Sequence, residues 1–228
     1  MTTCLSAKVP DERGWFNPEE ITKLENGEVV VSRSIIKVED GNTVHSYVGS
    51  VLVHLPEEVL WEILNYPERQ AEWLSWIQKS ELLSERCVSE NKKIKVVEYE
   101  ASILFINAQY TLIYEFDYTK RSITGVMDMT KPKEFFEYIK NGYEFFPYED
   151  GYIFQYWSYS KQDLYLPEFL LNYLARRTVT SGVGKVVEEC ERVAKERKEK
   201  IVINTCQKDV KSGDIKSGDT IPNYDVTY

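Results

Sequence analysis

Hydrophobic and polar residues alternate along much of the chain, which is the pattern of half-buried β-strands. Stretches 28–40 and 43–55 flank the turn signal at 40–42 and predict a β-hairpin. Further strands are expected at 77–86, 92–101, 104–117, 120–129, 142–148 and 151–162. Because only turn-length gaps separate them, we expect an antiparallel meander rather than alternating strands and helices.

Three segments have helical periodicity instead. Residues 17–27 form a short helix with a polar cap at its start, and 55–74 form two short helices divided at Pro67. A long helix opened by Pro167 spans 166–200 near the end of the chain. Its apolar positions are Leu170, Leu171, Leu174, Val183, Val186, Val187, Cys190 and Val193.

The order of these elements resembles that of the START-like, or SRPBCC, superfamily. The resemblance rests on "SYVGSVLVHLPEEVLWEILNYPERQAEWLSWIQKSELL" at 46–83 and "LPEFLLNYLARRTVTSGVGKVVEECERVAK" at 166–195. The second stretch is similar to the closing helix of polyketide-cyclase-like and coenzyme-Q-binding-like members. The resemblance implies an α+β helix-grip fold, in which a curved antiparallel sheet wraps around a long C-terminal helix. Two short helices follow the first core strand in this fold.

The resemblance also implies three parts of the chain. Residues 1–42 are expected to form an N-terminal extension with a short helix and an added strand, and 43–200 a START-like ligand-binding domain. Residues 201–228 are expected to be a surface tail, in which "VKSGD" is followed directly by "IKSGD".

The function that the resemblance implies is the binding of a hydrophobic molecule in an apolar cavity between the sheet and the long helix. The leading hypothesis is a protein that carries or sequesters a lipid, an isoprenoid or a sterol-like molecule. A second hypothesis is an aromatase/cyclase-type enzyme, which predicts an inward carboxylate or histidine. A third is an adaptor protein, which predicts a cavity filled by side chains. Transient membrane contact fits the first hypothesis.

Strand periodicity selects the residues that would line such a cavity. In 109–117 the apolar side chains share one face, and Ile123, Met127 and Met129 are expected to face inward from the next strand. Both faces of 151–160 are aromatic, so the period does not choose between them. A strand that is apolar on both faces lies under an extension of the chain or at an interface.

The long helix is expected to contribute residues from its first turns. An inward Arg177 would contact an anionic partner or a ligand headgroup, whereas a surface arginine is the more common case. The predicted ligand-binding residues are Tyr110, Leu112, Tyr114, Phe116, Ile123, Met127, Phe154, Tyr156, Phe169, Leu170, Tyr173, Leu174 and Arg177.

Composition and charge narrow the function further. The 228 residues carry a net charge of −9, which disfavours nucleic-acid binding, and include 16 Tyr, 9 Phe and 5 Trp. The two histidines, His45 and His54, lie on one predicted strand about 30 Å apart and cannot share a metal. Glu115 and Asp128 are expected to face outward. We therefore expect no catalytic residue, no metal and no cofactor.

The cysteines and the hydropathy of the chain indicate in which cellular compartment the protein is expected. None of Cys4, Cys87, Cys190 and Cys206 forms a CxxC pair, and Cys190 falls on the apolar face of the long helix. Cys4 and Cys206 would be able to pair in an exported protein. No signal peptide is visible, and the apolar stretch at 101–114 is too short to span a bilayer. We expect a soluble protein, cytoplasmic as given and periplasmic or exported if a leader was removed. The sequence does not indicate an oligomeric state.

Overall fold

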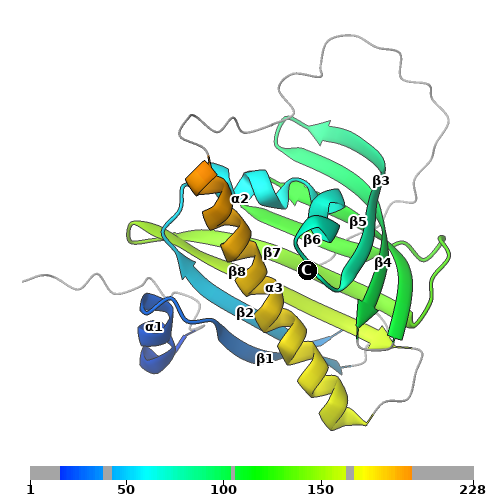
Figure 1. The fold of residues 1–228 in the computed structure, drawn as a ribbon, viewed down its shortest axis with the longest axis horizontal. Coiled ribbons are helices and arrows are strands. Elements are labelled where there is room, and N and C mark those ends of the chain that lie inside the picture. Colours follow the sequence, from blue (N-terminus) through cyan, green and yellow to red (C-terminus); the bar gives the residue numbers. More distant parts are fainter. Residues whose placement is uncertain (1–15, 38–42, 104–105, 163–166, 197–228) are drawn as a thin grey trace, which may run out of the picture.

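The computed structural model describes residues 16–37, 43–103, 106–162 and 167–196, which form one curved sheet with helices on both faces (Figure 1). The helical elements are α1 (Pro18–Glu25), α2 (Glu57–Leu64), the 3-10 helix η1 (Pro67–Glu72) and α3 (Glu168–Glu196). The strands are β1 (Val30–Lys37), β2 (Thr43–Val53), β3 (Ile77–Ser89), β4 (Lys92–Ile103), β5 (Ile106–Asp117), β6 (Ser122–Met127), β7 (Phe136–Tyr148) and β8 (Gly151–Gln162).

The eight strands form one antiparallel sheet in the order β1-β2-β8-β7-β6-β5-β4-β3. Strands β3 to β8 follow one another as a meander, and β2 then pairs with β8. The long helix α3 crosses the concave side of this sheet, and α2 and η1 cover one end of the same side (Figure 1). This arrangement confirms the predicted α+β helix-grip fold.

The two short helices after β2 are fixed by prolines and by a buried tryptophan. Pro56 precedes the first turn of α2, and Pro67 begins η1, where a missing backbone N–H costs nothing. Trp61 is only 2% exposed and lies between Tyr118 and Phe145, with ring centroids 4.7 and 5.0 Å away. Its indole N–H donates to Glu57 Oε1 over 3.1 Å, so its polar atom is satisfied as well.

One apolar stripe attaches α3 to the sheet. The stripe is Val179, Val183, Val186, Cys190 and Val193, all buried. Gly49 in β2 permits the close approach, because a Cβ atom there would lie 2.7 Å from a methyl group of Val179. Only glycine therefore fits beneath this part of α3.

A second, smaller core lies on the convex face. Leu24 of α1 packs there with Leu52 and Ile153, and Asn17 caps α1 by accepting a hydrogen bond from the Glu20 N–H over 2.9 Å. The N-terminal helix thus covers the outer side of β2 and reaches Ile153 of β8. This accounts for the outward apolar residue Ile153, whereas the neighbouring Phe154 faces inward.

Several expected boundaries need correction. Met129 was expected to face inward, but β6 ends at Met127 and Met129 is 50% exposed. The chain turns at Asp128, whose carboxylate accepts hydrogen bonds from both the backbone N–H and the hydroxyl of Thr130. Strand β7 begins at Phe136, six residues before the expected start at 142, and carries a bulge near its beginning.

Cysteine placement agrees in part with expectation. Cys190 is a buried free thiol, and burial raises the pKa of this thiol to about 12. Cys87 is disulfide-bonded. Cys4 and Cys206 lie outside the described residues, so the expected pair between them stays a prediction.

Other expectations fall outside the described residues. These include the hairpin turn at 40–42 and the tail at 201–228. The division of the chain into an extension, a ligand-binding domain and a tail stays a prediction, although β1 of the extension does pair with β2. Among the helices that the structure describes, none has the length and apolar character of a membrane-spanning segment.

Candidate functional site: a tyrosine-lined cavity beneath the long helix

A small cavity lies between the concave face of the sheet and α3. Its volume is about 50 Å³. The strands supply most of its wall, the segment after η1 supplies a tryptophan-bearing rim, and α3 supplies the roof. The lining residues are Gln70, Trp73, Leu74, Trp76, Ile77, Tyr99, Tyr110, Leu112, Tyr114, Asn141, Tyr143, Tyr156, Gly182 and Val186.

Five tyrosines form the centre of this cavity. The rings of Tyr99 and Tyr110 stack with centroids 5.3 Å apart, and those of Tyr143 and Tyr156 stack at 5.0 Å. Tyr114 meets Tyr99 edge to face at 6.4 Å. Strands β4, β5, β7 and β8 each place at least one of these side chains on the concave face, because alternate residues of a strand share a face.

Hydrogen bonds link the tyrosines to one another and to η1. The hydroxyl groups of Tyr99 and Tyr114 are 3.0 Å apart, and the Tyr99 hydroxyl also donates to the Pro67 carbonyl over 3.3 Å. Gln70 Nε2 donates to the Tyr143 hydroxyl over 3.2 Å. The polar groups of the cavity therefore hold η1 against the sheet.

Burial keeps these hydroxyl groups protonated. Removal from water disfavours tyrosinate and raises the pKa of all five side chains above the ordinary value for tyrosine: Tyr99, Tyr110, Tyr114, Tyr143 and Tyr156. At neutral pH the cavity thus offers neutral hydroxyl groups that donate and accept hydrogen bonds. It does not offer a tyrosinate base.

Alkaline pH should destabilise the protein for the same reason. An unfolded chain loses tyrosine protons near pH 10, whereas the folded chain retains those of Tyr99 and Tyr143. The free energy of unfolding should stay level up to about pH 9 and fall above pH 10, by about 1.4 kcal/mol per pH unit for each such tyrosine. Urea titrations from pH 8 to pH 11, with tyrosinate absorbance as a second signal, would check this. Tyrosines that all ionise near pH 10 in the folded protein would contradict it.

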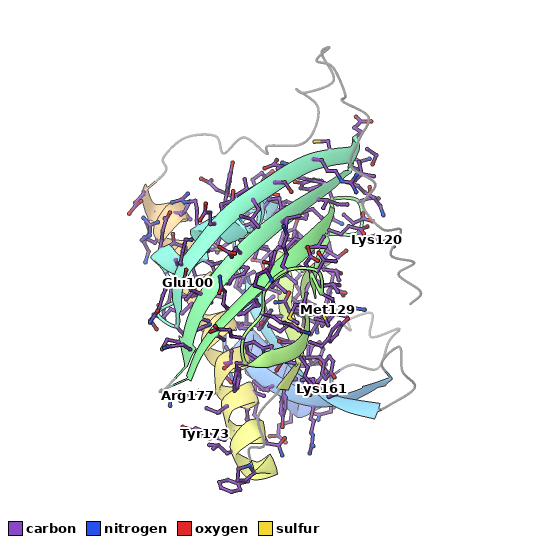
Figure 2. The ribbon with its side chains drawn as sticks, turned by 90° about the vertical axis from the view of Figure 1, so that its right-hand side faces the viewer. Glu100, Lys120, Met129, Lys161, Tyr173 and Arg177 are labelled. Carbon is purple, nitrogen blue, oxygen red and sulfur yellow. The ribbon has the colours of Figure 1, made fainter. Side chains whose placement is uncertain are left out.

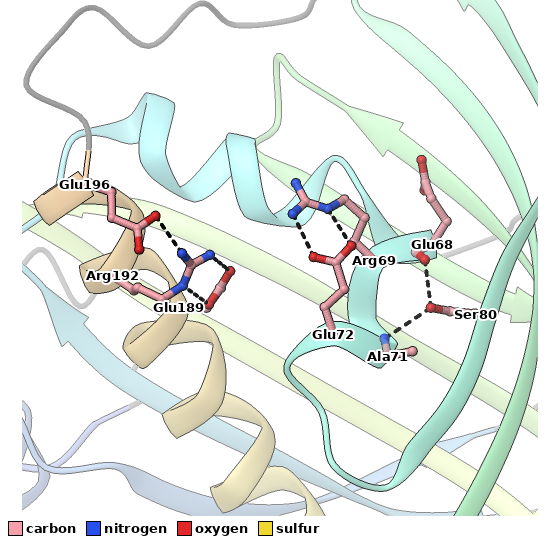
Figure 3. Close-up of polar contacts among 8 residues, drawn as sticks. All are labelled: Glu68, Arg69, Ala71, Glu72, Ser80, Glu189, Arg192 and Glu196. Carbon is pink, nitrogen blue, oxygen red and sulfur yellow. Dashed lines mark hydrogen bonds and ion pairs between the residues drawn. The ribbon is translucent and has the colours of Figure 1, made fainter.

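Polar contacts fix the rim of the cavity (Figure 3). Ser80 Oγ donates to the Glu68 carbonyl over 2.7 Å and accepts from the Ala71 N–H over 3.1 Å, which joins η1 to β3. Arg69 pairs with Glu72 on the same short helix. Across from this pair, Arg192 of α3 bridges Glu189 and Glu196 (Figure 3).

A cluster of ion pairs around the buried Lys95 lies beside the cavity. Lys95 is 2% exposed and lies 2.9 Å from Glu68 Oε1 and 3.3 Å from Glu85 Oε2. Its ammonium group also lies 4.9 Å from the centre of the Tyr66 ring. The side chain of Lys93 pairs with Glu85 at 2.7 Å. These lysines precede Val97 and Tyr99 along one face of β4, and Lys95 lies against η1 through its pair with Glu68.

The structure places the predicted ligand-binding residues in three groups. Tyr110, Leu112, Tyr114 and Tyr156 line the cavity. A second group, Phe116, Ile123, Met127 and Phe154, is buried in the core without lining it. The five residues of α3 form the third group, and none of them lines the cavity.

The expected inward orientation needs correction for Phe169, Tyr173 and Arg177. Phe169 is 75% and Tyr173 56% exposed, and Arg177 donates to the Tyr173 hydroxyl on the surface. Figure 2 shows Tyr173 and Arg177 on the end of α3 that extends away from the sheet. Leu170 and Leu174 are partly buried outside the cavity lining. The cavity lies further along α3, at Gly182 and Val186.

Sequence reasoning missed most of the rim and part of the floor. The missed residues are Gln70, Trp73, Leu74, Trp76, Ile77, Tyr99, Asn141, Tyr143, Gly182 and Val186. A signal existed for Val186, which lies on the apolar stripe of the long helix. For Gln70 and Asn141 there was none, because a polar residue in a predicted helix or strand is normally assigned to solvent.

The described residues contain no catalytic or metal-binding constellation at this site. The cavity lining that the structure describes includes no Asp, Glu, Lys, Arg or His. Within the same described ranges, no three ligands are grouped to hold a metal ion. His54 lies 2.9 Å from Asp150 on the surface, and Glu115 pairs with Lys92. The side chain of His45 is outside the described residues.

The curved sheet and the long helix together form a START-like helix-grip fold. Among solved structures, a START superfamily protein from Mycobacterium smegmatis is similar to this chain with a TM-score of 0.56 and 14% identity. The match covers 66% of this chain and 99% of that one.

Two further solved structures show the same fold. The Zhui aromatase/cyclase from Streptomyces sp. R1128 has a TM-score of 0.54 at 14% identity, over 65% of this chain and 94% of that one. A STAR-related lipid transfer protein from Xanthomonas axonopodis has a TM-score of 0.53 at 17% identity, over 71% and 93%. No protein-family model and no curated protein matches the sequence. At these identities the likeness establishes the fold alone.

Proposed function

We propose that this protein binds a hydrophobic small molecule beneath α3 and carries or sequesters it. The observation that supports this most is the cavity itself, whose aromatic and aliphatic lining carries no charge among the described residues. Such a lining favours a lipid-like, isoprenoid or sterol-like molecule, because apolar burial contributes about 25 cal/mol per Å². The neutral tyrosine hydroxyls would orient a polar end.

The cavity is too small to hold a whole ligand unless part of the protein moves. A typical ligand pocket holds about 300–1,000 Å³, far more than the 50 Å³ enclosed here. The enclosed space therefore accepts one end of a ligand, and the remainder needs η1 and the rim at Trp73 and Trp76 to move outward. Both tryptophans are only partly buried and lie where such an opening would form.

The small volume also favours one competing hypothesis. An adaptor that uses this fold for protein association predicts a hollow filled by side chains, and the space left between the five tyrosines is only about 50 Å³. The aromatase/cyclase hypothesis has less support, because it predicts an inward carboxylate or histidine and the described lining has neither. Ligand uptake is the property that separates the carrier from the adaptor.

Native mass spectrometry of the purified protein tests the proposal directly. We expect an additional mass from a co-purifying hydrophobic molecule, which organic extraction removes and which added 1-dodecanol replaces. The variant Tyr114→Asp, which places a charge in the cavity, should take up no dodecanol, whereas Leu83→Asp on the exposed surface should bind like the unmodified protein. An extracted protein that takes up no hydrophobic probe would support the adaptor instead.

A further inference from the structure

Asn141 is the one buried polar group of the cavity lining whose oxygen has no partner in the described part of the chain. The residue is 8% exposed and comes from β7, where it pairs with Gly125 on one side and Ser158 on the other. A buried carbonyl oxygen without a donor is unfavourable and rare in native proteins. Its presence beside a cavity indicates that a donor is supplied from elsewhere.

The surroundings of Asn141 leave its side-chain oxygen without a hydrogen-bond donor. A Cβ atom at Gly125 would lie 2.5 Å from Asn141 Oδ1 and 2.6 Å from the Tyr114 ring, so the missing side chain provides the space that the amide occupies. The amide also hydrogen-bonds the hydroxyls of Tyr114 and Tyr156, which opposes the rise in their pKa.

The other polar groups of the described lining restrict what the ligand can bring. The hydroxyls of Tyr99 and Tyr143 already have partners in η1, and no lysine, arginine or histidine is present to balance an anion. A carboxylate or phosphate would be desolvated there without a counter-charge. A neutral O–H or N–H group would instead supply the donor that Asn141 lacks.

We propose that Asn141 determines specificity for ligands whose buried end is uncharged and carries a hydrogen-bond donor, such as an alcohol or a phenol. The inference rests on the proposed function and adds the ligand class. An apolar molecule that ends in a hydroxyl should bind, its methyl ether should bind more weakly, and the corresponding carboxylate should bind least. Asn141 is a binding residue in this account, and no covalent step is involved.

The test compares three probes of equal chain length: 1-dodecanol, dodecyl methyl ether and dodecanoate at pH 8. Titration calorimetry on the extracted protein should show dodecanol binding at least 10-fold more tightly than either of the others. In Asn141→Leu, which keeps the side-chain size, the preference over the ether should fall below 3-fold while the ether itself still binds. The control Asn91→Leu, at the exposed turn between β3 and β4, should keep the full preference.

The outcomes separate this inference from the proposed function. Equal binding of the alcohol and the ether by the unmodified protein would overturn the role of Asn141 and leave hydrophobic binding intact. A preference that persists in Asn141→Leu would do the same. Failure of all three probes to bind would overturn both proposals. The comparison of probes on the unmodified protein needs no variant, so it tests the preference for a hydrogen-bond donor even if Asn141→Leu does not fold.

Discussion

Replacing Gly182 with leucine is expected to weaken the binding of a hydrophobic probe at least 10-fold without destabilising the fold. Gly182 lines the cavity from α3, and a Cβ atom there would meet only the Tyr156 ring, at 3.7 and 3.8 Å. The added side chain would enter the cavity and take up space that a ligand needs. Leucine in place of glycine inside a helix contributes up to about 1 kcal/mol, which offsets strain from crowding.

Gly184 provides a matched control two residues further along α3. A Cβ atom at Gly184 meets nothing within 4 Å, and the residue does not line the cavity. Gly184→Leu should therefore gain the same helix stability and leave dodecanol binding unchanged in titration calorimetry. Gly182→Ala should fall between Gly182→Leu and the unmodified protein. Equal binding by both leucine variants would show that this cavity is not the binding site.

The largest loss of stability is expected for Trp61→Ala. The substitution empties a fully buried site between Tyr118 and Phe145 and removes a hydrogen bond to Glu57. The free energy of unfolding should fall by about 3–5 kcal/mol, the usual cost of truncating a buried aromatic residue. Urea denaturation, followed by circular dichroism, would measure the change.

Trp73→Ala is the matched comparison for this second prediction. Trp73 is only partly buried and lies on the rim of the cavity. Its truncation should cost less than about 2 kcal/mol, since part of its surface is already in water. It should nevertheless weaken dodecanol binding, because it removes part of the rim over which the ligand passes. A loss of stability as large as that of Trp61→Ala would contradict the separation of core from rim.

The fold could be predicted from the sequence because its signals are local. Prolines and turn residues divided the chain, and strict alternation placed Tyr110, Leu112 and Tyr114 on one face of β5. Each of these three lines the cavity. The position of α2 and η1 after the first long strand was equally clear from Pro56 and Pro67.

The remainder of the site could not be predicted because it depends on tertiary packing. Lys93 and Lys95 share the inward face of β4 with Tyr99. Charged residues are normally assigned to the solvent face, and only the folded structure shows that Glu68 and Glu85 pair with these lysines. Likewise, an apolar residue at the start of α3 satisfies the same helical period as one over the cavity. Only the placement of α3 on the sheet shows that Gly182, rather than Phe169, lies at the site.

The central claim is that a hydrophobic guest occupies the space enclosed by the sheet and α3. Isotope-filtered nuclear Overhauser spectroscopy of the protein with bound 1-dodecanol tests it most directly. Our account predicts contacts from the probe to the methyl groups of Leu112 and Val186, both of which line the cavity. Contacts only to exposed methyl groups, such as those of Leu83 and Val88, would contradict it.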